Sequence, residues 1–322
     1  MTLNVTSQKG VDTQFTSADL TLSLDDFSQR IINPAMAVLA AAIEADAFSM
    51  ALDVYNAVNN IGNVISFKNT LQARKILNDN LAPMDGSRSI ILNTQDNVDL
   101  VDALKGLFQD SSEIKAQYRD GVMGHTAGFE FSENTLLPTQ TTGTALSATT
   151  YTVNGANQTG SAVTVATGST TFKKGDIVTL AGCFRVHPET KTVLGDLQQF
   201  VVTADYAGGG GNLAISPAIV TSGGTQNVSA SPTNGGAVTK VGGASAVYKP
   251  SLAFHKDAFT FATADLVLPK GVDMASRAVM DGISMRLVRQ YDINYDRFPV
   301  RLDVLYGYQT LRAQLACRIL SN

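Results

Sequence analysis

A sharp change in composition between Thr141 and Tyr248 limits what this chain can fold into more than any other feature. Across these 108 residues only nine are Asp, Glu, Lys or Arg, whereas the other 214 residues contain 43. The same segment holds 17 of the 27 glycines. Short Val, Thr and Ile runs alternate there with Gly, Asn and Ser, and Asn-Gly pairs begin at Asn154 and Asn234. The pattern predicts a separate all-β module.

The segment before this module predicts a long helix. Asn33 and Pro34 offer an N-cap and a first-turn proline, and the alanine-rich run after them extends to about Asn60. Apolar residues recur on one face of this helix, at Leu39, Ile43, Met50, Val54 and Ala57. We expect this face to pack on a core.

Strand and helix signals surround the long helix and the β module. Residues 15–24 predict a strand that enters a short helix, and residues 71–80, 89–92 and 98–108 predict helix, strand and helix. Longer charged strands return after Ser251. The sequence therefore predicts an α+β domain into which the β module is inserted.

Composition and motifs offer little support for an enzyme or a metalloprotein. The net charge is −4 without a basic block, which argues against direct DNA binding. Cys183 and Cys317 are far apart, so we expect two free buried thiols. The three histidines, His125, His187 and His255, are isolated. We expect no catalytic residues, no cofactor, no metal, no secretion signal and no membrane span.

The C-terminal strands carry an unusual set of charges. Residues 277–322 contain seven arginines, four aspartates and no lysine, interleaved with aromatic residues. Arginine loses less than lysine on desolvation and binds carboxylates in a bidentate way, so this pattern favours subunit contacts, although a solvated face also fits. The interface candidates here are Arg286, Arg289, Asp292, Asp296, Arg297 and Arg301.

Three long segments resemble phage major capsid proteins. They are FTSADLTLSLDDFSQRIINPAMAVLAAAIEAD, NTQDNVDLVDALKGLFQDSSEIKAQYRDGVMGHTAGFEF and MRLVRQYDINYDRFPVRLDVLYGYQTLRAQLACRIL. More narrowly, they are similar to the coat-protein family of phage P-twenty-two, which has the Hong Kong ninety-seven capsid fold with an inserted β-barrel-like domain. FKKGDIVTLAG, residues 172–182, resembles a strand and turn of that insertion.

The resemblance implies a division of the chain. Residues 1–22 would be part of the extended loop, with Phe15 and Leu20 as further contact candidates, and residues 141–248 the insertion. The peripheral domain with its spine helix would comprise 23–69 and 282–322, and the axial domain 70–140 and 249–281. Family members begin with an N-terminal arm and an outgoing loop strand, so we expect this sequence to be a shortened form or a processed or truncated product.

The resemblance also implies a function and partners. The chain is expected to self-assemble into pentamers and hexamers of an icosahedral shell, to be made in the bacterial host cytoplasm and to reside in the virion. Scaffolding protein and portal would be partners during assembly, and packaged DNA would be enclosed without specific binding. A tail-tube or adhesin-like β protein, and a hydrolase with a β accessory domain, are the alternatives.

Overall fold

The computed structural model describes residues 2–18, 32–104, 124–147, 151–166, 168–280 and 282–321. These residues form two compact units. The first comprises Met1–Met50 and Phe259–Leu311, and the second comprises Ala51–Ala258 and Arg312–Asn322. The boundaries of these two units differ from those of the four-part division expected from the resemblance. The four-part division stays a prediction. Each unit is described by itself.

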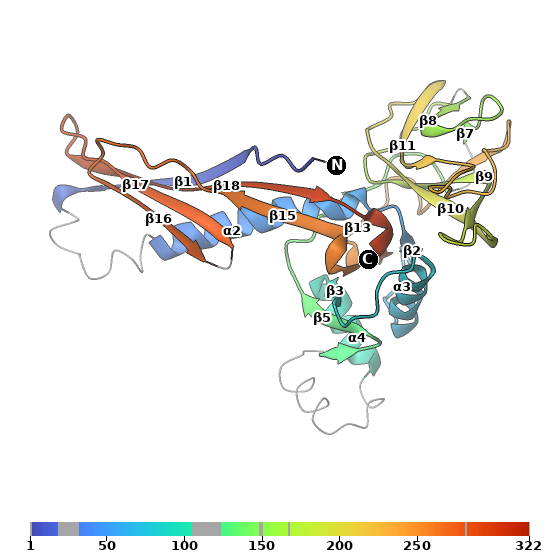
Figure 1. The fold of residues 1–322 in the computed structure, drawn as a ribbon, viewed down its shortest axis with the longest axis horizontal. Helices are drawn as coiled ribbons and strands as arrows, with labels where there is room; N and C mark the ends of the chain where they lie inside the picture. Colours follow the sequence, from blue (N-terminus) through green and yellow to red (C-terminus); the bar gives the residue numbers. More distant parts are fainter. Residues whose placement is uncertain are drawn as a thin grey trace. The chain divides into compact units, whose positions relative to one another are not determined.

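The first unit is built on a five-stranded antiparallel sheet (Figure 1). Its order is β1-β18-β17-β16, and β15 pairs with the far part of β18. The long strand β18 pairs with β1 over ten residues, from Ser7 opposite Tyr306 to Thr16 opposite Arg297. The strands run over Ser7–Thr16 (β1), Phe259–Ala264 (β15), Met274–Met280 (β16), Ile283–Arg289 (β17) and Arg297–Thr310 (β18).

Helix α2, Asn33–Phe48, packs on one face of this sheet. Leu39 and Ile43 are buried against Leu302, Val304 and Tyr306 of β18. A polar contact supplements the apolar one, because Asp46 pairs with Lys9 Nζ of β1 at 2.7 Å and accepts a hydrogen bond from the Tyr306 hydroxyl. The helix is thereby held in one position along the sheet.

The expectation of one helix up to Asn60 was wrong. α2 ends at Phe48 and a 3-10 turn, Ser49–Asp53, follows it. Residues Ala57–Asn59 then form strand β2, which pairs in parallel with the C-terminal strand β19, Ala316–Leu320. Met50, Val54 and Ala57 are buried, as expected, but not on a shared helix face. Strand pairing outweighs the local helix propensity at this point.

The strand expected at 15–24 begins earlier than predicted and includes Phe15 and Thr16, and residues 19–24 lie outside the described part of the chain. β1 covers Ser7–Thr16, because β18 offers it a ten-residue partner along this earlier segment. The expected short helix after it, and Leu20, lie mostly or wholly in residues 19–31, outside the described part of the chain.

One segment passes a simple test for a membrane-spanning helix, contrary to our expectation. Asn33–Asp53 is 21 residues long with a mean hydropathy of 1.6 in its most apolar window. The same test is passed by core helices of soluble proteins, so length and composition are weak evidence. The contacts of Leu39, Ile43 and Asp46 with the sheet are those of a helix packed on protein.

The second unit contains a six-stranded mixed sheet of order β2-β19-β14-β3-β5-β4. Helices α3, Phe67–Asp79, and α4, Thr94–Leu104, accompany it. The Asn93 side chain caps α4 by accepting from the Asp96 N–H at 2.8 Å. Asp96 in turn accepts hydrogen bonds from the hydroxyls of Ser251 and Ser321. The remaining strands are Arg88–Leu92 (β3), His125–Thr126 (β4), Phe129–Glu133 (β5) and Ser251–His255 (β14).

The same unit contains a second six-stranded sheet formed by the glycine-rich segment, of order β7-β12-β9-β10-β11-β8. It has its own apolar core, with Val163, Val178, Phe200 and Leu213 fully buried. The predicted Val, Thr and Ile runs are strands, as expected. They are Tyr151–Thr152 (β7), Gly160–Val165 (β8), Ile177–Val186 (β9), Val193–Val202 (β10), Gly211–Ile219 (β11) and Ala237–Lys240 (β12); Gln140–Thr141 (β6) pairs with Val247–Tyr248 (β13) beside it.

Neighbouring residues of α2 give a direct test of its packing. Leu39 is 1% exposed and Val38 is 62% exposed. Leu39→Ala should lower the free energy of unfolding of the subunit by about 2–4 kcal/mol, because it leaves a cavity against β18. Val38→Ala is the control and should change it by less than about 0.5 kcal/mol. Urea unfolding followed by circular dichroism measures both, and equal effects would contradict this packing.

Candidate subunit interface

A fully buried carboxylate organises the face of the first sheet opposite α2. Side chains alternate along β18, so Leu302 and Val304 face the helix and Asp303 faces away. Arg286 of β17 binds Asp303 in a bidentate way, with Nε to Oδ1 at 2.9 Å and Nη2 to Oδ2 at 2.6 Å. Gln8 of β1 donates to the same carboxylate at 2.8 Å. Asp303 thus joins three adjacent strands.

The protonation behaviour of Asp303 follows from these contacts. Burial by itself would raise its pKa, but hydrogen bonds from Arg286 and Gln8 and the charge of Arg286 outweigh burial and place the pKa below the ordinary value. The pKa of Arg286 is raised, chiefly by its hydrogen bonds to Asp303. Both groups are therefore charged at neutral pH.

Arg301 lies on the same face and bridges two carboxylates. Its Nε donates to Asp303 at 3.2 Å and its Nη1 approaches Asp12 of β1 at 3.4 Å. Gly10 lies opposite Asp303, and a Cβ there would be 3.0 Å from the Asp303 Cβ. The absence of a side chain at Gly10 lets β1 approach this charged cluster closely.

An aromatic cluster occupies the end of the sheet near the β17–β18 turn, on the α2 side. Phe15 of β1 stacks on Phe298 of β18 with ring centroids 5.3 Å apart, and Tyr291 contacts Phe298 at 4.9 Å. The Arg289 guanidinium lies 5.6 Å from the Phe298 ring centroid and pairs with Asp273 at 2.7 Å. Arg289 is thereby held by one carboxylate and one ring.

The remaining candidates are Asp292 and Asp296 in the β17–β18 turn, residues 290–296, and Arg297, the first residue of β18. Arg297 Nε pairs with Asp292 at 3.2 Å, and its guanidinium lies over the Tyr295 ring at 4.6 Å. Asp296 accepts hydrogen bonds from the hydroxyls of Tyr291, at 3.0 Å, and Ser17. Asp292 and Arg297 thus balance each other, whereas the Asp296 carboxylate has hydroxyl partners only.

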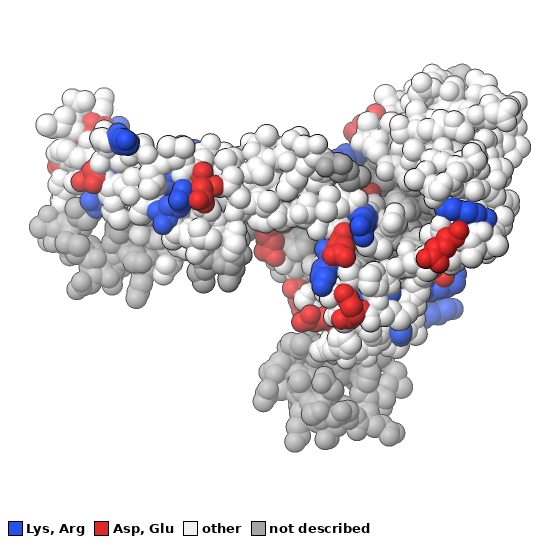
Figure 2. Space-filling model, viewed as in Figure 1, with Lys and Arg blue, Asp and Glu red and all other residues white. Residues whose placement is uncertain are grey.

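The structure gathers most of the sequence-predicted residues on three neighbouring strands and one turn. Every candidate arginine has a partner within its own chain, so the positive charges are balanced before any second copy approaches. The visible surface agrees, because Lys and Arg atoms lie beside Asp and Glu atoms without a wide area of one sign (Figure 2). Their role in subunit contacts stays a prediction.

Sequence reasoning missed several residues at this site. Asp303, Gln8 and Asp273 are the partners of the arginines, and nothing in the local sequence marks them. The exposed Ile293 was also missed, although an apolar residue within a polar turn is a usable signal, whereas Tyr295 is one of the aromatic residues interleaved with the predicted arginines.

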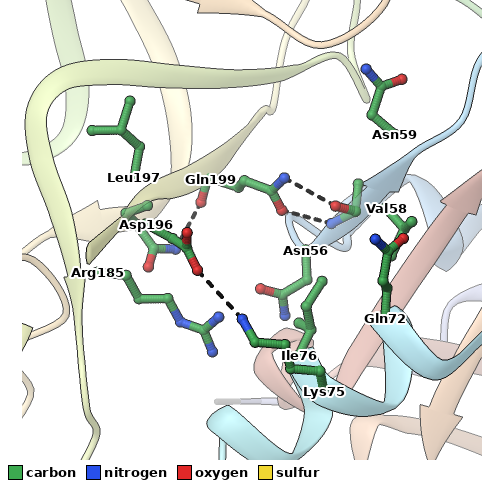
Figure 3. Close-up of a pocket in the computed structure, with 12 residues that line it drawn as sticks. Asn56, Val58, Asn59, Gln72, Lys75, Ile76, Arg185, Asp196, Leu197 and Gln199 are labelled. Atoms are coloured by element: carbon green, nitrogen blue, oxygen red, sulfur yellow. Dashed lines mark hydrogen bonds and ion pairs between the residues drawn. The ribbon is translucent and has the colours of Figure 1, made fainter. Parts of the chain in front are cut away.

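A pocket of about 400 Å³ lies within the second unit (Figure 3). It lies between α3, β2 and the β9–β10 hairpin. The Gln199 side chain binds both backbone groups of Ala57, accepting from N–H at 2.7 Å and donating to C=O at 3.0 Å. Lys75 is 3.5 Å from Asp196 at its rim. The lining groups thus largely satisfy one another, and a nucleophile with its base is not among them.

The described residues also contain no group of three or more His, Cys, Asp or Glu side chains suited to a metal ion. His255 is buried with Nε2 3.1 Å from Asp85, and His187 accepts backbone hydrogen bonds in its own turn. Cys183 and Cys317 are free and buried, as predicted, and burial raises the pKa of the Cys183 thiol to about 11.

Comparison with known proteins decides the family. The family model described as P22 coat protein, gene protein 5, matches residues 1–318. The chain belongs to the P22 coat protein family. It is therefore a phage major capsid protein, and such a protein self-assembles into a capsid shell and resides in the virion.

Solved structures with a similar chain trace also come from phages. A Mycobacterium phage Che8 chain has a TM-score of 0.49 at 13% identity, covering 98% of this chain and 71% of that one. The capsid of cyanophage P-SCSP1u gives 0.45 at 11%, covering 99% and 73%, and the mature capsid of bacteriophage PhiM1 gives 0.42 at 9%, covering 100% and 72%. No curated protein matches the chain. The family match alone carries the assignment.

A coat protein acts through its contacts, so membership in the family favours a structural role for this sheet over the hydrolase and tail-tube alternatives. The charged cluster around Asp303 and the aromatic cluster around Phe298 lie on opposite faces of the first sheet and hold its strands together from both sides. A rigid face loses little conformational freedom when a second copy binds.

The buried carboxylate gives a prediction with a matched control. Asp303→Asn should lower the free energy of unfolding of this coat protein by about 3 kcal/mol, because it leaves Arg286 without its counter-charge. Asp12→Asn removes the exposed partner of Arg301 and should cost less than about 1 kcal/mol.

The same variants differ in their dependence on pH. Because the pKa of Asp303 is lowered in the folded protein, its contribution is complete above the ordinary value of 3.8 and is lost as the pH falls through the lowered value. Stability of the unaltered protein should therefore fall more steeply below about pH 4 than that of Asp303→Asn. Urea unfolding at pH 3 and pH 6 measures this loss. If the free energy of unfolding falls by the same amount in both proteins between these pH values, the assignment is contradicted.

Proposed function

We propose that this chain forms the pentamers and hexamers of an icosahedral shell that encloses the double-stranded DNA of a tailed phage. The match of the P22 coat protein model to residues 1–318 carries this proposal. Identical copies reuse the same contacts around each ring, and closure of the rings yields a finite shell. Many moderate contacts per subunit make such a shell firm although each pair binds weakly.

We further infer the Hong Kong ninety-seven type capsid fold, with residues 141–248 as an inserted all-β domain. The separate apolar core of the sheet between Tyr151 and Lys240 supports this division. In this proposal residues 1–22 belong to the extended loop, 23–69 and 282–322 to the peripheral domain, and 70–140 and 249–281 to the axial domain.

The partners follow from the same proposal. Scaffolding protein and portal would guide assembly in the host cytoplasm, and DNA would be enclosed without specific binding. The net charge of −4 supports the last point, because a wall without a basic surface does not retain packaged DNA electrostatically.

The experiment that tests this function is electron microscopy of the purified full chain, alone and with a co-expressed scaffolding protein. Closed icosahedral particles are expected. Tubes or fibres would instead support a tail-tube or adhesin-like protein, and dispersed monomers under both conditions would contradict self-assembly.

The arginine candidates give a sharper test. Arg289→Ala and Arg301→Ala should reduce the yield of particles at least fivefold while unfolding of the soluble subunit shifts by no more than about 1 kcal/mol, since both side chains are partly exposed. Arg277→Ala is the control. Arg277 lies on the edge strand β16, and its replacement removes a single ion pair with Asp265. Normal particle yields for both variants would remove these arginines from the interface.

A further inference from the structure

The two Asn-Gly pairs of the chain meet at one corner of the β module. They begin at Asn154 and Asn234, the two places in the sequence where asparagine precedes glycine. Asn154 follows β7, and Asn234 lies between β11 and β12, the strand that pairs with β7. Both asparagines are exposed. Strand pairing thus brings together two labile pairs that are far apart in the sequence.

Asparagine is a thermolabile residue, and a glycine after it makes the loss of its side-chain amide easy. The backbone nitrogen of the glycine attacks the asparagine Cγ, so a C–N bond forms and the Cγ–Nδ2 bond breaks. The proton lost from the backbone nitrogen leaves with the amide group as ammonia. Water then opens the succinimide at one of its two carbonyls and gives aspartate or isoaspartate. Glycine favours the attack because no Cβ hinders the approach of its nitrogen.

The folded protein binds both attacking nitrogens. Gly155 N–H donates to the Asn234 side-chain Oδ1 at 2.8 Å. Gly235 N–H donates to the Val153 carbonyl, also at 2.8 Å. Val153 directly precedes Asn154, so each Asn-Gly pair receives its acceptor from the turn that contains the other. A donated N–H keeps its proton and its position, because breaking such a bond costs about 0.5–1.5 kcal/mol.

The backbone around Asn154 is held as well. Its N–H donates to the Thr164 carbonyl at 2.9 Å, and its carbonyl accepts from Gln158 Nε2 at 2.9 Å. Ring closure has to rotate this backbone, so both bonds oppose it. The bond from Gly155 to Asn234 differs from them because it acts on the attacking nitrogen itself and depends on one side chain.

We propose that Asn154-Gly155 is a deamidation site that the Asn234 side chain holds inactive in the folded protein. Deamidation adds a negative charge to the connection between β7 and β8, and isoaspartate also inserts a methylene group into its backbone. The bonds of Asn154 to Thr164 and Gln158 lie at this point. A subunit that persists in a virion benefits from such protection. The inference does not depend on the proposed assembly, because every contact lies within one chain.

Mass spectrometry of the full-length protein tests the site. Samples are incubated at mildly alkaline pH, which favours loss of the glycine proton, and deamidation is measured in peptides that contain residue 154. Asn234→Ala should accelerate deamidation there about fivefold, as expected for the loss of one hydrogen bond on the attacking nitrogen. Asn234→Asp keeps an oxygen acceptor and should leave the rate close to that of the unaltered protein.

Asn212→Ala is the matched control. Asn212 is another exposed asparagine of the β module, and it accepts one hydrogen bond from the Thr164 hydroxyl at 2.8 Å. Its replacement should leave the rate at residue 154 unchanged. Circular dichroism shows whether each variant is folded. Unaltered protein unfolded in guanidinium chloride gives the rate without any of these bonds, and this comparison needs no variant.

Three results would overturn the proposal. The first is a folded unaltered protein that deamidates at residue 154 as fast as the unfolded one. The second is a folded Asn234→Ala variant that deamidates there no faster than the unaltered protein. The third is equal acceleration by Asn212→Ala, because it would show a general loosening of the β module.

Discussion

The first unit depends on the pairing of one long strand with its neighbours. β18 pairs with β1 on one side and with β17 and β15 on the other, and its alternate side chains serve two different purposes. Leu302, Val304 and Tyr306 pack against α2. On the opposite face, the Asp303 carboxylate binds the side chains of Arg286, Arg301 and Gln8. A shift of β18 by one residue would exchange the two faces, so its register is strongly specified.

The arrangement of charge also suits a protein that must bind many copies of itself. Removing one partner of a buried ion pair leaves a costly unpaired charge, and here the Asp303 pairs join three adjacent strands. Neutralising the arginines within the chain means that a second copy need not supply counter-charges at each contact.

Membership in the P22 coat protein family gives these features a common purpose. A shell subunit must keep its shape while the same surfaces are reused in slightly different surroundings. Rigidity from the Asp303 cluster, the Phe15–Phe298 stack and the braced β17–β18 turn meets this requirement. One apolar face of α2 is buried on the sheet through Leu39 and Ile43.

The sequence by itself determined the features that depend on neighbouring residues. Alternating Val and Thr runs with glycine turns predicted the strands around Val163, Val178, Phe200 and Leu213, and the clustering of arginine near the C-terminus marked the strands of the first sheet. Composition and motif order also carried the family resemblance. These signals are local, because strand periodicity and turn chemistry act over a few residues.

Only the tertiary structure decided what depends on partners far along the chain. Ala57–Asn59 is a strand because Arg318 to Leu320 pair with it, and local propensity alone favoured a helix there. Asp303 and Asp273 lie only 17 and 16 residues from Arg286 and Arg289, yet strand pairing is needed to bring them together. Asp12 binds Arg301 from 289 residues away. Hydrogen bonds and ion pairs between residues more than 200 positions apart leave no trace in the local pattern, since chain folding alone brings those groups together.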